Sequence, residues 1–184
     1  MERDGVVGWP VSASRTVYAN RWITVREDTV TRPDGEPGVY GVVTVRQPSV
    51  FVVALTEGDE VLLVDVDRHT VGRSLEVPAG GTDGEEPLVA AQRELAEEAG
   101  VTASSWEEIG RMQALNGICE APEVVFLARG LTAITTTAQA EEGIQGVHRV
   151  PWTEALAMVA DGRITDGETV AALMYAALAR GLVR

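Results

Sequence analysis

Three glutamates within five residues are the feature of this sequence best suited to chemistry. Glu94, Glu97 and Glu98 stand at positions i, i+3 and i+4, so on a helix their carboxylates share one face. Like charges at this spacing destabilise a helix, and near its carboxyl end the helix dipole adds to the penalty. A bound cation offsets both costs. Mg²⁺ takes oxygen ligands, and Glu94 with Glu98 can supply the protein's share of its coordination sphere.

A neighbouring arginine can neutralise one of these acids. Arg93 directly precedes Glu94, and we predict that its partner is Glu85, eight residues earlier and about two helical turns back. The competing interpretation is a solvated acidic helix face with no ligand, which is the ordinary meaning of clustered glutamates. The residues around the cluster decide between the two.

A helix over residues 86–99 must position the cluster. Pro87 suits its first turn and Gly100 suits the position after its last. The apolar side chains recur at helical spacing, on the face that we expect to be opposite the glutamates. They are Leu88, Ala91, Leu95 and Ala99.

The other elements follow from runs of Val, Ile and Thr and from turn residues. Strands are predicted over residues 22–30, 39–45, 50–55, 61–66, 107–115, 124–128 and 147–151, the first four forming two hairpins. Thr153 and Asp166 are predicted to cap helices that run to Ala160 and Ala179, and residues 1–14 are expected to be loose. The order predicts an α/β (α+β) fold, with a mixed β-sheet sandwiched between helices and an N-terminal antiparallel β-hairpin.

Length, charge and cysteine content limit the class of protein. The 184 residues, 45% of them hydrophobic, fit one domain over 1–184. A net charge of −13 disfavours nucleic acid and anionic lipid as partners, whereas a small phosphorylated ligand remains compatible. Cys119, the single cysteine, cannot form an intramolecular disulfide, and no apolar run near the N-terminus is long enough to span a membrane. We therefore expect a cytoplasmic protein.

The segment around the cluster resembles the Nudix box, in which a glycine and a glutamate precede Arg-Glu-apolar-x-Glu-Glu-x-Gly-apolar. The matching residues are Gly80, Glu85, Arg93, Glu94, Leu95, Glu97, Glu98, Gly100 and Val101. The resemblance implies the Nudix fold and a Mg²⁺-dependent hydrolase, with Mn²⁺ able to substitute, that cuts a pyrophosphate bond in a nucleoside diphosphate-linked molecule. One difference is the spacer between Gly80 and Glu85, which has four residues where the family usually has five.

Residues 76–80, with the arginines before them and 162–164 before the last predicted helix, resemble the ADP-ribose pyrophosphatase branch of that family. This implies nucleoside monophosphate and sugar phosphate as products from ADP-ribose or a related nucleotide sugar. The implied metal ligands are the Ala79 carbonyl, Glu94, Glu97 and Glu98. The implied substrate-binding residues are Arg68, Arg73, Glu76 and, more weakly, Arg46, and the implied catalytic residues are Glu142, Glu97, Glu141, Arg93 and Glu85.

The sequence leaves the identity of the general base open. The branch uses an acid on a late loop, which favours Glu142 over its neighbour Glu141, whereas other Nudix enzymes use a helix glutamate, here Glu97. The branch also commonly forms homodimers through N-terminal strands, here residues 15–47, with a small-molecule substrate as the other partner.

Other functions remain as alternatives. Asn116 to Glu120 replace a loop in which the branch usually has a proline, so other nucleotide sugars stay open. A Nudix module that binds a nucleotide without hydrolysis is one alternative, although the complete glutamate set argues against it. An isoprenoid diphosphate isomerase is another, but it should carry an active cysteine, and we predict no catalytic role for Cys119.

Overall fold

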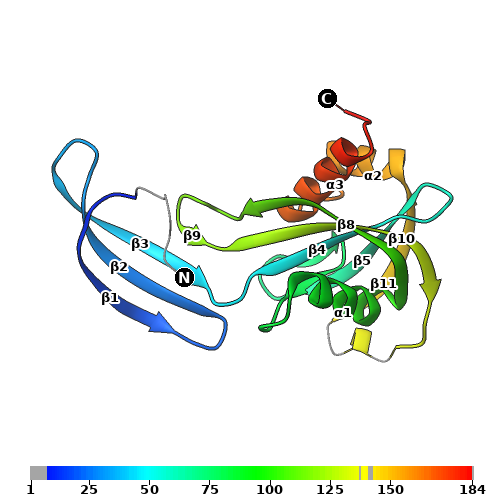
Figure 1. Ribbon diagram of the computed structural model, residues 1–184, viewed down its shortest axis with the longest axis horizontal. Helices are drawn as coiled ribbons and strands as arrows, with labels where there is room; N and C mark the ends of the chain where they lie inside the picture. The colour runs from blue at the N-terminus through cyan, green and yellow to red at the C-terminus, as the bar shows by residue number, and fades with distance from the viewer. Residues whose placement is uncertain (1–7, 137, 141–142, 184) are drawn as a thin grey trace. The chain divides into compact units, whose positions relative to one another are not determined.

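The structure is a computed structural model that describes residues 8–136, 138–140 and 143–183 (Figure 1). The chain folds into two compact units. Unit 1 comprises residues 1–46 and 113–121, and unit 2 comprises residues 47–112 and 122–184. The assignment of the whole chain to one domain stays a prediction.

Unit 1 is a sheet of four strands in the order β1-β2-β3-β9. Strands β2 (Ile23–Thr31) and β3 (Pro37–Val45) pair antiparallel from Ile23 with Val45 to Thr31 with Pro37, which confirms the first predicted hairpin. Strand β9 (Cys119–Glu120) pairs parallel with β3. Strand β1 (Val11–Ala19) contradicts the expectation that residues 11–14 are loose. All nine of its residues are exposed. The strand has no buried face, so its sequence lacks the alternation of apolar and polar residues by which a half-buried strand is predicted.

Unit 2 is built around a sheet in the order β7-β4-β10-β8. Strand β4 (Ser49–Ala54) pairs parallel with β10 (Pro122–Ala133) and antiparallel with β7 (Ala79–Gly81), so the sheet is mixed, as predicted. Strand β8 (Val101–Gln113) completes it and begins six residues before the strand predicted at 107.

A second sheet of unit 2 has the order β11-β5-β6. It consists of β11 (Ile144–Pro151), β5 (Glu60–Arg68) and β6 (Gly72–Glu76). The predicted hairpin between β4 and β5 is therefore wrong. Only the bridge between Leu55 and Val61 joins the two strands, because β4 is already paired on both edges by β7 and β10.

Three helices pack on the sheets of unit 2. The apolar side chains of β4 alternate between two buried clusters, one shared with α1 (Pro87–Ala99) and the other with α2 (Trp152–Ala160) and α3 (Gly167–Ala179). Val52 lies in the first cluster and Val53 in the second. The sheet is thus sandwiched between helices, which confirms the predicted fold class.

The helix ends follow the predicted signals at three of four sites, and Pro87 lies in the first turn of α1 as expected. Gly100 ends α1 in the left-handed conformation at φ 65°, and the Asp166 side chain accepts a hydrogen bond from the Thr169 amide at the start of α3. Thr153 is not a cap, because α2 begins one residue earlier, at the buried Trp152.

Candidate active site

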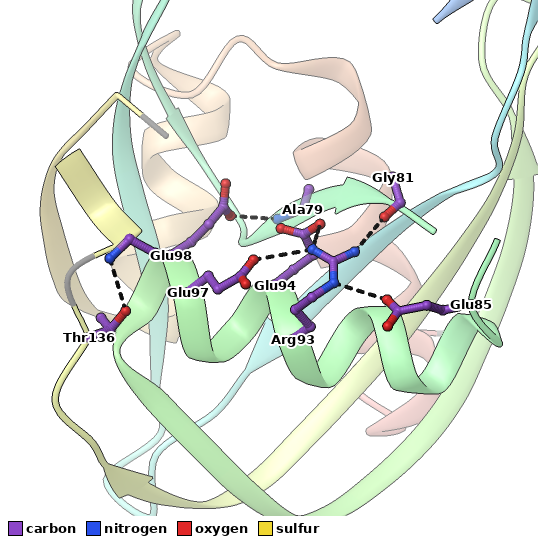
Figure 2. A network of polar contacts seen from close by, with 9 residues as sticks. Ala79, Gly81, Glu85, Arg93, Glu94, Glu97, Glu98 and Thr136 are labelled. Carbon is purple, nitrogen blue, oxygen red and sulfur yellow. Dashed lines mark hydrogen bonds and ion pairs between the residues drawn. The ribbon is translucent and has the colours of Figure 1, made fainter. Parts of the chain in front are cut away.

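The α1 carboxylates lie against strand β7 (Figure 2). Glu94 and Glu98 are buried, with exposed fractions of 6% and 4%, and Glu97 is half-buried. The competing interpretation, a solvated acidic face, is therefore wrong for Glu94 and Glu98. Leu88, a member of the predicted apolar stripe, is exposed. The physical reason is that α1 has two neighbours, the sheet cluster on one side and the β7 backbone on another.

Two backbone positions of β7 hold these carboxylates. The Ala79 amide donates a hydrogen bond to Glu98 Oε2 at 2.8 Å (Figure 2). Gly80 lies so close to Glu94 that a Cβ atom on the glycine would stand 2.1 Å from Glu94 Oε1. A side chain at position 80 would therefore force the Glu94 carboxylate away from the backbone. Both acids are turned into the narrow space between α1 and β7.

Arg93 pairs with three acids, two on α1 and one in the loop before it. Its Nε donates to Glu85 at 2.9 Å, its Nη1 to Glu94 at 2.7 Å and Glu97 at 3.2 Å, and its Nη2 to the Gly81 carbonyl at 2.9 Å (Figure 2). The pair of Arg93 and Glu85 is the one that the sequence predicts. Burial acts to lower the pKa of Arg93, but these carboxylates outweigh it and raise the pKa above its usual value.

The donor set fits a hard divalent cation. Glu94, Glu98 and the Ala79 backbone offer only oxygen for coordination, in one small space. No group of three or more His, Cys, Asp or Glu side chains encloses a metal position within the described ranges. Mg²⁺ commonly takes one or two protein carboxylates and completes its octahedron with water and substrate phosphates, so Glu94 and Glu98 would suffice to hold one.

A cavity of about 470 Å³ adjoins β7. Arg68 and Glu76 lie in its lining and form a two-bond ion pair, at 2.6 Å and 3.2 Å, so two of the predicted substrate-binding residues lie side by side. Glu76 holds the pKa of Arg68 above its usual value. The remaining lining residues are Ser49, Phe51, Thr70, Val71, Ser74, Ala79, Gly80, Gly81, Thr165, Asp166, Gly167 and Glu168.

The other predicted site residues lie elsewhere. Arg73 pairs with Asp65 and lines a different cavity, so it does not join Arg68. Arg46 is exposed at the end of β3 in unit 1. Glu141 and Glu142 fall outside the described residues. The segment before them is anchored to α1, because Gln139 Nε2 donates to the Glu98 carbonyl at 2.8 Å.

The sequence did not point to the first turn of α3 as part of the cavity. Asp166 was assigned only as a cap, yet it lines the cavity with Glu168. Thr169 Oγ1 accepts a hydrogen bond from the Val77 amide at 3.0 Å, which ties this turn to the segment that leads into β7. An acid pair at a helix start is ordinary helix chemistry, so only the tertiary contact reveals it.

Comparisons with known proteins agree with this geometry. Residues 45–173 match the NUDIX domain model, and residues 9–43 match the model of the nucleoside diphosphate sugar hydrolase N-terminal domain. The chain is 32% identical to an ADP-ribose pyrophosphatase of Mycobacterium tuberculosis over 88% of this chain and 80% of that protein. It is 34% identical to a GDP-mannose pyrophosphatase of Yersinia enterocolitica, over 65% of this chain and 63% of that protein.

The fold has a close counterpart among solved structures. An ADP compounds hydrolase superposes with a TM-score of 0.82 at 21% identity, covering 95% of this chain and 97% of the other. The chain belongs to the Nudix hydrolase family, whose members act on pyrophosphate bonds. No helix of the described residues is both long and apolar enough to cross a membrane.

Proposed function

We propose that this protein is a Mg²⁺-dependent pyrophosphatase of nucleoside diphosphate sugars, with ADP-ribose or a related nucleotide sugar as substrate. The products are a nucleoside monophosphate and a sugar phosphate, and Mn²⁺ is expected to substitute for Mg²⁺. The names of the relatives, an ADP-ribose and a GDP-mannose pyrophosphatase, support this substrate class and leave the nucleoside open.

The observation that carries the proposal is the burial of Glu94 and Glu98 against the β7 backbone, at the edge of a cavity. Burying two carboxylates side by side is costly unless positive charge compensates them. Arg93 compensates Glu94 in part, through one guanidinium shared with Glu85 and Glu97. A solvated acidic face does not account for this arrangement, whereas a cation site does.

Pyrophosphate cleavage needs charge neutralised on the phosphoryl oxygens and a water aligned with the leaving group. Glu94, Glu98 and the Ala79 carbonyl, with Glu97 nearby, would hold a divalent cation, which would supply the first need and lower the pKa of a bound water. Arg68 donates to the diphosphate from within the cavity, and Arg93 fixes the orientation of Glu94 and Glu97. A carboxylate takes the proton of the attacking water, and we favour Glu142 over Glu97 and Glu141 for this role.

A substrate screen tests the proposal. The purified protein is incubated with ADP-ribose, GDP-mannose, other nucleotide sugars and dinucleoside diphosphates, with and without Mg²⁺, and a phosphatase then releases phosphate from the products. We expect phosphate from at least one nucleotide sugar, and only when metal is present. Binding without turnover across the whole panel supports the nucleotide-binding alternative instead.

Two further parts of the proposal concern the whole protein. We propose that it is a cytoplasmic homodimer in which residues 15–47 take part in the interface. Support for the second statement comes from β1, an edge strand whose nine residues are all exposed, and from the match of residues 9–43 to a separate N-terminal domain model.

A further inference from the structure

The cavity beside β7 has an acidic wall that the proposed chemistry does not use. Asp166 and Glu168, from the first turn of α3, line the same cavity as Ala79 and Gly80. Among the described lining residues the one guanidinium is that of Arg68, and Glu76 already pairs with it. The charged groups facing the cavity are therefore three carboxylates and one arginine, so the space is net negative before any cation binds.

Helix stabilisation explains part of this wall. Asp166 accepts a hydrogen bond from the Thr169 amide, and a carboxylate in the first turn, such as Glu168, is favoured by the helix dipole. The position of Glu168 is nevertheless unfavourable for its charged form, because burial and then the charges of Asp166 and Glu76 raise its pKa. The Val77 amide donates to Thr169, whose own amide donates to Asp166, so this first turn of α3 is tied to the segment that leads into β7.

A further carboxylate, Glu123, lies behind Asp166 and Glu168, and helix stabilisation does not explain its position. It is only 6% exposed, and its Oε2 has no hydrogen-bond partner among the described residues. Glu123 pairs in register with the cavity residue Ser49, and by strand alternation it stands on the same face of β10 as Val125, which packs in the cluster that contains α3. Repulsion from Glu168 and Asp166 acts on Glu123, so its carboxylate lies near the start of α3, although it does not line the cavity itself.

We propose that Asp166 and Glu168, backed by Glu123, form a sugar subsite that selects an uncharged, hydroxyl-rich sugar and rejects a negatively charged group at the same place. This inference rests on the proposed function and adds to it the chemical class of the second half of the substrate. Hydroxyl groups donate hydrogen bonds to carboxylates, so a neutral sugar satisfies the acceptors of the wall. When both acids are ionised, a carboxylate or further phosphate would face two like charges in a partly buried cavity.

The geometry also gives the substrate a direction. Its diphosphate belongs near Arg68 and β7, where the predicted cation site can neutralise it, and its sugar belongs against the first turn of α3. The exclusion of charge is then a property of the sugar end alone.

The test compares two substrates that share a nucleoside diphosphate and differ only at the sugar C6, as hexose or as hexuronate. The pairs are GDP-mannose with GDP-mannuronate and ADP-glucose with ADP-glucuronate, and both are measured. The intact protein and its Glu168→Gln variant are assayed at saturating Mg²⁺ and pH 8. The matched control is Glu154→Gln, which also removes an acid from a first helical turn, in α2, but lies outside this cavity.

We expect the unaltered protein to prefer the neutral sugar in kcat/KM by about tenfold, from charge repulsion at a partly screened separation. Glu168→Gln should reduce that preference, mainly by lowering KM for the hexuronate, and Glu154→Gln should leave it unchanged. Equal kcat/KM for the two sugars, or a preference that survives Glu168→Gln, overturns the subsite while the hydrolase assignment stands. If the unaltered protein hydrolyses none of these substrates, both the sugar subsite and the hydrolase assignment are overturned.

Discussion

Gly80 shows how a single residue can shape the predicted metal site. Its missing side chain lets the β7 backbone reach the Glu94 carboxylate, and the neighbouring Ala79 amide holds Glu98. The position of both acids thus depends on the backbone beside them as much as on α1. This contact was beyond prediction from the sequence, which matched Gly80 to the glycine of the box but did not indicate its neighbour.

Gly80→Ala should therefore impair activity. The new Cβ would meet Glu94 Oε1 at 2.1 Å, so the carboxylate or the strand must shift, and we expect activity to fall by about 10- to 100-fold, as for substitutions that misplace metal ligands. Steady-state assays with a Mg²⁺ titration measure the loss. Gly81→Ala is the control, because its Cβ would meet nothing nearer than Asp83 Oδ1 at 3.7 Å. Equal effects of the two substitutions would refute the close-approach argument.

Glu94→Gln and Glu98→Gln should each remove most turnover while the protein stays folded. Glutamine keeps the size of each buried side chain, and at position 98 its carbonyl oxygen can still accept from the Ala79 amide. We expect a loss of at least about 100-fold, beyond the range typical of groups that only support a ligand. Rates at saturating Mg²⁺ and circular dichroism of each variant check this. Near-normal turnover in either variant would remove that residue from the metal site.

The choice of general base is a prediction about Glu142 and Glu97. If Glu142 takes the proton, Glu142→Gln should lower kcat by about 100-fold or more with KM and metal affinity nearly unchanged, since the residue acts in the transition state. Glu97→Gln should affect kcat less. Glu97 contacts Arg93, which also pairs with the predicted metal ligand Glu94, so this variant can also change metal affinity. Comparing the two kcat values at saturating Mg²⁺ and substrate decides the order. A larger loss in Glu97→Gln would assign the base to α1.

At the scale of the elements, helix ends could be predicted from local sequence signals, whereas the pairing of strands could not. The start and end of α1 and the Asp166 cap follow from Pro87, Gly100 and Asp166 itself, because these signals act within one helical turn. The partner of β4 did not follow, because an apolar strand gives no sign of which strand lies beside it. The short strand β7 was missed for a related reason. Its three residues, Ala79–Gly81, have no strand-forming side chains, and pairing with β4 alone defines it.

The same limit applies to the site. The box residues fixed the pairing of Arg93 with Glu85, since spacing along one helix and its entry loop decides it. The separation of Arg68 from Arg73 depended on register, because Arg68 on β5 pairs with Gly72 of β6, and the next residue, Arg73, points to the opposite face of the sheet. The cavity wall of α3 needed the whole fold, because a long stretch of sequence separates it from β7.

Glu123 on β10 gives a prediction about pH. Burial, with repulsion from Glu168 and Asp166, raises its pKa to about 7, above the ordinary 4.5. Between pH 4.5 and 7 the folded protein keeps the Glu123 proton that the unfolded chain has lost. The free energy of unfolding therefore falls as the pH rises through this range. Above pH 7 the destabilisation by Glu123 has its full size. Glu123→Gln should thus stabilise the protein relative to the unaltered chain by about 1 to 3 kcal/mol at pH 8 and by little at pH 4.5.

Urea unfolding at the two pH values measures this difference. Glu154→Gln, at a more exposed acid on α2, should show no comparable change in the gain between the two pH values. A gain for Glu123→Gln of the same size at pH 4.5 and pH 8 would show that ionisation of Glu123 is not its cause.

At the scale of the whole molecule, the homodimer is testable directly. Exposed apolar side chains on and near β1, including Val17, Tyr18 and Trp22, are expected to be covered by a second copy. Light scattering at micromolar concentration should give about twice the 19.6 kDa chain mass, and Val17→Glu should shift the molecules toward monomer. A monomer at all concentrations tested would contradict this prediction.

The net charge of the molecule limits which substrates it can bind. A net charge of −13 makes a polyanionic partner unfavourable, yet the site is expected to take a diphosphate. These two statements agree only if positive charge is supplied locally, by Arg68, Arg93 and a divalent cation. Dependence on metal is therefore the central claim of the proposed function.

The most direct test is the identity of the products formed from ADP-ribose and GDP-mannose by the unaltered protein, resolved by ion-exchange chromatography before and after EDTA treatment. We predict AMP with ribose 5-phosphate, or GMP with mannose 1-phosphate, formed only when Mg²⁺ is present and lost in Glu98→Gln. Unchanged substrate in Mg²⁺, or the same products in the presence of EDTA, would contradict the account.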